Sequence, residues 1–184
     1  MKRDPAIEDS VRLRVAVLVS VMAAGTAVLR VGAVGPILAT ACIVGIPAAY
    51  AFSHLTRRRD DLWLKIVVAV GFVLALANSL AAVAGMGAEA AGSVQVPLAE
   101  LFLWVQFLHS MHLPTRRDLL FSVASSVALI AIAGVLSTSL DLVPHLLVWL
   151  VAFVTSLVLA HDSELAELPA LGPPIDEGRS AVPS

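Results

Sequence analysis

The chain has 184 residues, of which 59% are hydrophobic and 14% are charged, with a formal net charge of -2. Soluble domains average about 45–50% apolar and about 25% charged residues, so the composition excludes an ordinary soluble domain and is typical of a membrane protein. The small net charge offers no basic footprint for nucleic acid, and the single cysteine, Cys42, excludes a disulfide within the chain and a cysteine-based zinc site.

Six apolar segments follow a polar N-terminal segment over residues 1–10. A transmembrane helix needs about 20 predominantly apolar residues, and these segments reach or approach that length. Pro47 is expected to kink the second segment. Residues 11–160 are therefore predicted to form an all-α, polytopic membrane bundle of six transmembrane helices. The predicted bounds are 11–29, 37–53, 62–86, 98–112, 119–140 and 145–160.

The character of the sequence changes after the sixth segment. Residues 161–184 are rich in proline and in acidic side chains, and they contain too few apolar residues to bury a core. We expect a disordered cytoplasmic tail there.

Along the chain, connections between apolar segments that contain Lys or Arg alternate with connections that contain few or none. With the N-terminus inside, every Lys and Arg except Arg30 falls on the cytoplasmic side, which is the distribution that the positive-inside rule favours. The pattern predicts that both termini are cytoplasmic. The turns that carry this signal contain Arg57, Arg58, Arg59, Arg116 and Arg117.

The second of these turns has a clear local logic. Pro114 ends the incoming helix because it lacks a backbone N–H. Thr115 and Asp118 form the pattern Thr-x-x-Asp before an apolar run, which predicts a capping box. Arg116 and Arg117 lie at the positive end of the dipole of the following helix, where a cation is unfavourable. Their role in keeping this turn in the cytoplasm is the better explanation for their presence.

Few polar residues lie inside the predicted spans. Asn78, Gln106 and His109 are the candidates for interhelical or partner contacts. His109 and His112 are spaced like a pair of metal ligands, but no third ligand is evident, so no metal site is predicted.

Small residues recur at four-residue spacing in the third segment. Ala77, Ala81 and Gly85 form one such row, which favours close helix contacts. A contact within the chain is the first interpretation, and a contact between chains is the alternative.

The stretch from Trp104 to Ser110, followed by Leu113 to Leu119, resembles the membrane region of bacterial transglutaminase-like membrane proteins of the TgpA type. The resemblance implies a bundle of N-terminal helices that precedes an extracytoplasmic transglutaminase-like domain. No residue of this chain matches the Cys-His-Asp triad of that domain, so no catalytic role follows from the resemblance.

The sequence carries no HExxH, Gly-x-Ser-x-Gly or phosphate-loop motif, and no cofactor is expected. The leading hypothesis is a non-enzymatic scaffold or anchor in the bacterial cell membrane, supporting a membrane or extracytoplasmic protein partner in the cell envelope. The alternative is a small transporter or channel subunit, although polar groups at mid-depth are scarce. A membrane enzyme that uses His109, His112 and Glu100 is the third hypothesis.

Overall fold

The structure is a computed structural model that describes residues 10–32, 34–56, 62–86 and 94–167. These residues form helices and contain no β-strand, which confirms the all-α prediction. The elements are α1 (Val11–Arg30), α2 (Pro36–Thr40), the π-helical η1 (Ala41–Gly45), α3 (Ile46–Thr56), α4 (Leu62–Gly85), α5 (Gln95–Ser110), α6 (Arg116–Leu136) and α7 (Leu142–Glu167).

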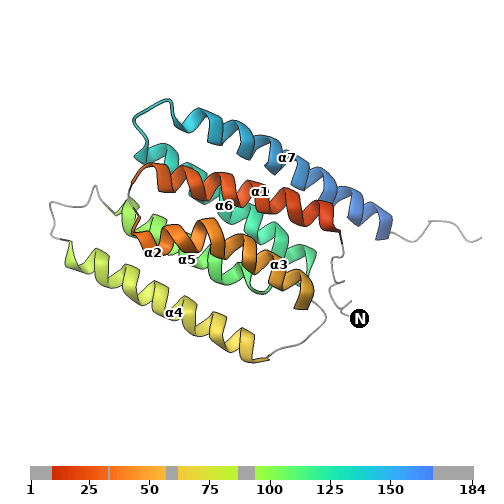
Figure 1. Cartoon of the computed structure of the whole chain (residues 1–184), viewed down its shortest axis with the longest axis horizontal. Coiled ribbons are helices and arrows are strands. Elements are labelled where there is room, and N and C mark those ends of the chain that lie inside the picture. Colours follow the sequence, from red (N-terminus) through yellow and green to blue (C-terminus); the bar gives the residue numbers. More distant parts are fainter. Residues whose placement is uncertain (1–9, 33, 57–61, 87–93, 168–184) are drawn as a thin grey trace, which may run out of the picture.

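Helix α1 lies at the centre of the bundle. It packs along α7 and α6, and it also contacts η1 and α3 (Figure 1). Helix α4 packs mainly against α5 and forms one edge, whereas α7 forms the opposite edge. The helices run side by side and alternate in direction, so the N-terminal end of α1 lies at the same end of the bundle as the C-terminal end of α3 (Figure 1).

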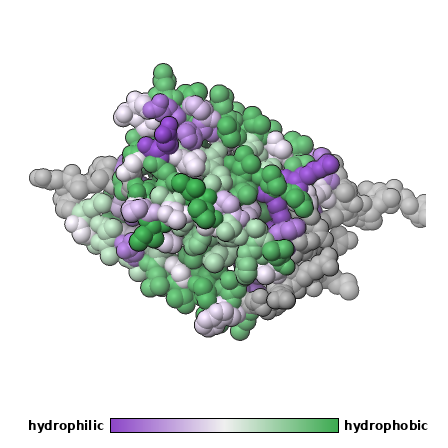
Figure 2. Space-filling model, in the orientation of Figure 1, coloured by the Kyte–Doolittle hydropathy of each residue, from purple (hydrophilic) through white to green (hydrophobic). Residues whose placement is uncertain are grey.

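Five helical segments of the described chain are long and apolar enough to cross a membrane. On the face of the bundle drawn in Figure 2, hydrophobic residues cover much of the surface between the two ends, as expected for a surface in contact with lipid. The protein is therefore a multi-pass membrane protein. The five segments are 11–30, 36–56, 62–85, 116–136 and 142–163. Helix α5, which has 16 residues, is not among them.

The second predicted helix contains a π-helical turn directly before Pro47. The N–H of Ile46 donates to the carbonyl of Ala41, five residues back, instead of to the residue four back. Pro47 has no N–H to donate and its ring crowds the preceding turn, and a π-bulge is one way for a helix to absorb such a disturbance. Helices α2, η1 and α3 thus form one continuous helical segment.

Helices α5 and α7 begin earlier than predicted, because each tolerates a proline as its third residue. Pro97 follows Gln95 and Val96 in α5, and Pro144 holds the same position in α7. The first N–H groups of a helix have no partner within the helix, so proline is tolerated in the first turn. The predicted starts at residues 98 and 145 were wrong for this reason.

The other ends of the last three helices also differ from the predictions. Helix α5 ends at Ser110 instead of residue 112, and α6 runs from Arg116 to Leu136 instead of 119–140. Thr115 and Asp118 form the predicted capping box at the start of α6, so Arg116 and Arg117 belong to its first turn.

The predicted disordered tail begins too early. Helix α7 has 26 residues and continues to Glu167, so residues 161–167 are helical. Acidic side chains are acceptable in a helix that extends beyond the apolar region, because a regular helix satisfies its own backbone wherever it runs. Residues 168–184 lie outside the described part of the chain.

A glycine allows α1 to approach η1 closely. A Cβ atom on Gly25 would lie 2.6 Å from the Sγ atom of Cys42, which is too close for a normal contact. Gly134 in α6 has space instead, because a Cβ there would lie 3.8 Å from its nearest neighbour, the side chain of Leu142.

These two glycines predict opposite effects of the same substitution. Gly25→Ala should lower the free energy of unfolding in detergent micelles by about 1–2 kcal/mol through overpacking. Gly134→Ala should leave it unchanged or raise it by up to about 1 kcal/mol, since Ala favours a helix. In a Cys42→Ala background the cost of Gly25→Ala should shrink. Equal losses for both glycine variants would contradict the assigned contact.

Candidate functional site

The hydroxyl of Ser126 joins three helices in the middle of the bundle. It donates to the carbonyl of Val123 in its own helix, 2.7 Å away. It accepts from Nε1 of Trp149 in α7 at 3.0 Å, and it lies 3.0 Å from the hydroxyl of Ser20 in α1. A hydroxyl has one proton and two lone pairs, so Ser20 is the donor to Ser126 if all three bonds form together.

A second contact joins α5 to α6. The Oε1 atom of Gln106, whose side chain is fully buried, accepts from the hydroxyl of Ser125. Its Nε2 atom donates to the hydroxyl of Ser110 at 3.4 Å, and this hydroxyl donates to the Gln106 carbonyl at 2.6 Å. The amide is thus bonded to another helix through its oxygen and to its own helix through its nitrogen.

A third contact lies nearer the end of the bundle where α1 begins. Arg14 is only 5% exposed, and its Nη2 atom donates to the carbonyl of Leu113 at 2.7 Å. The N–H of Leu113 donates to the hydroxyl of Ser53 at 2.7 Å. These two bonds tie α1 and α3 to the segment between α5 and α6.

We refer to these three contacts together as the polar seam. It begins at the Arg14 end of the bundle and reaches Ser126 in the middle. Its interhelical bonds lie within the chain, where they hold helices α1, α3, α5, α6 and α7 together. The residues of the polar seam are Arg14, Ser20, Ser53, Gln106, Ser110, Leu113, Ser125, Ser126 and Trp149.

His109 lies beside the polar seam but contacts a different part of α6. Its Nε2 atom is 3.0 Å from the carbonyl of Asp118, and its ring packs edge-on against Phe121 with the centroids 4.7 Å apart. His109 and Asp118 also line a recess of about 320 Å³ with Lys65 of α4 and with His112.

Asn78 does not belong to the polar seam. It is exposed on α4 and lines a shallow apolar recess with Trp104 and Leu108 of α5. Its neighbour Ser79 makes the contact between these helices, because the Ser79 hydroxyl donates to the carbonyl of Pro97 at 3.2 Å.

The predicted basic turns are only partly within the described chain. Arg117 is exposed and Arg116 is partly buried, whereas Asp118 caps α6 through its carboxylate, which accepts from the Thr115 N–H at 3.0 Å. Arg57, Arg58 and Arg59 lie outside the described residues.

The pairing of Ser20 and Trp149 with Ser126 could not be predicted from the sequence. Serines occur throughout the apolar segments, and their partners depend on which helices are neighbours. Arg14 is one of the basic residues near the N-terminus that predict a cytoplasmic N-terminus, and the structure shows that it is buried. Its place three residues beyond Val11, inside the first turns of a span, was the available hint.

The interactions that join the helices at this site are hydrogen bonds. Among the described residues, no group of three or more His, Cys, Asp and Glu side chains could hold a metal ion. Comparison with protein-family models, with curated proteins and with solved structures finds no match.

The Ser126 junction predicts a measurable loss of stability. Ser126→Ala removes two interhelical bonds, each worth about 0.6 kcal/mol on average in membrane proteins, so the free energy of unfolding should fall by about 1 kcal/mol. Ser156 is a matched control in α7, because it is fully buried and donates only to Ala152 of its own helix. Denaturant titration in mixed micelles should show the larger loss for Ser126→Ala, and equal losses would contradict the interhelical role.

Proposed function

We propose that this chain is a six-span, non-enzymatic scaffold of the cell membrane, with both termini in the cytoplasm. Helix α5 would be the sixth span. Its 16 residues rise about 24 Å, somewhat less than the about 30 Å of a bilayer core. A mismatch of this size is met by modest bilayer thinning. Helix α5 also runs alongside spans that connect the same two ends of the bundle (Figure 1).

The charge distribution supports this orientation. Arg12, Arg14, Lys65, Arg116 and Arg117 are in the first turns of α1, α4 and α6, which begin at the same end of the bundle. Arg30 is at the other end of α1. Short basic segments are retained in the cytoplasm, so the end where α1 begins is the cytoplasmic one.

The orientation predicts opposite labelling of two introduced cysteines in a Cys42→Ala background. Ser139 is exposed in the turn between α6 and α7, and Arg117 is exposed at the start of α6. In intact cells, a membrane-impermeant maleimide should label Ser139→Cys, but it should label Arg117→Cys only after permeabilisation. Labelling of both cysteines in intact cells would contradict the six-span topology.

The observation that carries the scaffold proposal is the outward face of α4. Ala77, Ala81 and Gly85 are all exposed, so the row does not make the contact within the chain that was its first interpretation. At about 100° per residue, Ala81 points roughly opposite to Ser79, which faces α5. A row of small residues lets another helix approach closely, so a transmembrane helix of a partner fits this face.

The polar seam supports the same function. Its bonds hold the helices to one another, as a scaffold requires. The resemblance to the membrane region of transglutaminase-like proteins suggests that the partner carries an extracytoplasmic domain in the cell envelope.

The test is a tagged purification of the full chain from native membranes in mild detergent, with mass spectrometry of the proteins that come with it. A stoichiometric membrane partner should be recovered. Ala81→Leu should reduce its recovery at least fivefold by blocking the row, whereas Ala131→Leu, at an exposed position of α6, should not. Equal recovery with both variants, or no stoichiometric partner, would contradict the scaffold proposal.

The buried cation of Arg14 favours a second candidate, a small transporter or channel subunit, because intramembrane charges often mark a solute path. Flux into liposomes separates the two candidates. The scaffold proposal predicts no flux above that of empty liposomes, whereas flux that Gln106→Leu abolishes would favour the transporter.

A further inference from the structure

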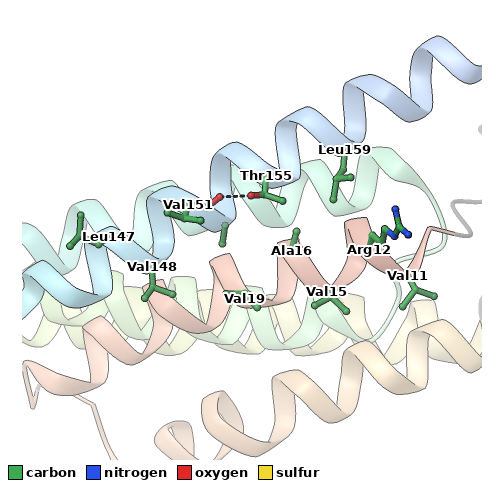
Figure 3. Close-up of a pocket in the computed structure, with 11 residues that line it drawn as sticks. Val11, Arg12, Val15, Ala16, Val19, Leu147, Val148, Val151, Thr155 and Leu159 are labelled. Carbon is green, nitrogen blue, oxygen red and sulfur yellow. Dashed lines mark hydrogen bonds between the residues drawn. The ribbon is translucent and has the colours of Figure 1, made fainter.

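An apolar groove follows the line between α1 and α7 on the outside of the bundle. One part, drawn in Figure 3, has a volume of about 850 Å³. The next part has a volume of about 460 Å³, and the two parts share Val19 and Val148. On α1 the lining runs from Val11 to Thr26, a distance of about 23 Å. The groove therefore covers most of the about 30 Å thickness of a bilayer core.

The groove has small side chains at its floor and larger side chains along its two sides. Ala16 and Ala152 are buried and lie at the floor. Val15 of α1 and Val151 of α7 are 52% and 68% exposed, and they stand on either side (Figure 3). Small residues at the exposed positions favour close packing of another helix, and these walls lack them. A slot of this shape suits a flexible hydrocarbon chain.

A cation lies at one end of this slot. Arg12 is the second residue of α1, is exposed, and lines the groove at the same end as Leu159 (Figure 3). The first turn of α1 contains no acidic residue, so the positive end of its helix dipole adds to the charge of the guanidinium. Because α1 is barely long enough to span, this end lies where lipid headgroups are.

We propose that the groove between α1 and α7 binds one anionic phospholipid, with an acyl chain in the slot and the phosphate at Arg12. The bilayer core is about 30 Å thick, so one leaflet supplies about 15 Å of chain, which the groove accommodates along its length. An anionic headgroup near one basic side chain gains about 1 kcal/mol, equivalent to about a fivefold preference over a zwitterionic headgroup. This site is separate from the α4 face of the proposed scaffold.

The experiment uses the full chain, purified in detergent and exposed to equal amounts of phosphatidylglycerol and phosphatidylcholine. Native mass spectrometry then counts the lipids that each protein retains. The wild-type chain should retain one lipid with about a fivefold preference for phosphatidylglycerol. Arg12→Gln should bring that preference close to parity.

Two matched controls make the result specific. Arg117 is also exposed and is also the second residue of its helix, so Arg117→Gln removes an equivalent charge and should leave the preference unchanged. Val15→Phe should block the slot and reduce retention of both lipids. Val73→Phe, on α4 at 66% exposure, should not.

Three outcomes would overturn the proposal. Equal effects of Arg12→Gln and Arg117→Gln would assign the preference to general surface charge. Unchanged retention with a monodisperse Val15→Phe protein would remove the lipid from the groove. A dimer mass that replaces the lipid-bound monomer, and that Val15→Phe abolishes, would assign the groove to a second copy of the chain.

Discussion

Polar groups within a bilayer must find their partners inside the protein, and this constraint explains the arrangement of the bundle. An unsatisfied donor in hydrocarbon costs several kcal/mol, whereas a satisfied one contributes little. The hydroxyl of Ser126 is a hydrogen-bond partner both for the indole N–H of Trp149 and for the hydroxyl of Ser20. These two bonds hold α1 next to α6 and α7. The central position of α1 follows from this junction and from the close approach at Gly25.

The same constraint separates the inner helices from the outer ones. Helices α1 and α6 contribute Ser20, Ser125 and Ser126 to the polar seam and have about half of their most apolar stretch buried, whereas α4 has none of its most apolar stretch buried. Lipid can solvate an apolar side chain as well as protein can, so α4 needs few neighbours. The small-residue row of α4 is therefore open at one edge of the bundle. The groove along α7 is open at the opposite edge. We propose a protein partner for the first and a lipid for the second.

Hydropathy predicts the helices well because a spanning segment must be apolar over about 20 residues whatever its neighbours are. Ends are harder to predict. Pro97 and Pro144 are breakers in the middle of a helix but are tolerated in the first turn, and the acidic residues after His161 continue α7 beyond the apolar region. The capping box of Thr115 and Asp118 was predictable because it depends on four consecutive residues.

The candidate site was predictable only in part, because its contacts are tertiary. The position of Gln106 in an apolar helix predicts an interhelical bond, but the identity of Ser125 as its partner depends on the rotation of α6. Ser126 and Trp149 are separated by 23 residues, and only the packing of α7 brings them together. The row at Ala77, Ala81 and Gly85 shows the converse, since a pattern typical of helix contacts lies on an open face.

A polar seam that holds the bundle closed must exclude water from the buried side of α6. Amide hydrogen exchange of the intact chain in lipid nanodiscs, followed along α6, tests it most directly. We expect slow exchange from Leu119 to Ala133, where α6 is most buried, and fast exchange in the first turn near Arg116. Rapid exchange around Ser122 and Ser126 would mean that water enters the seam, and it would contradict a closed scaffold in favour of a solute path.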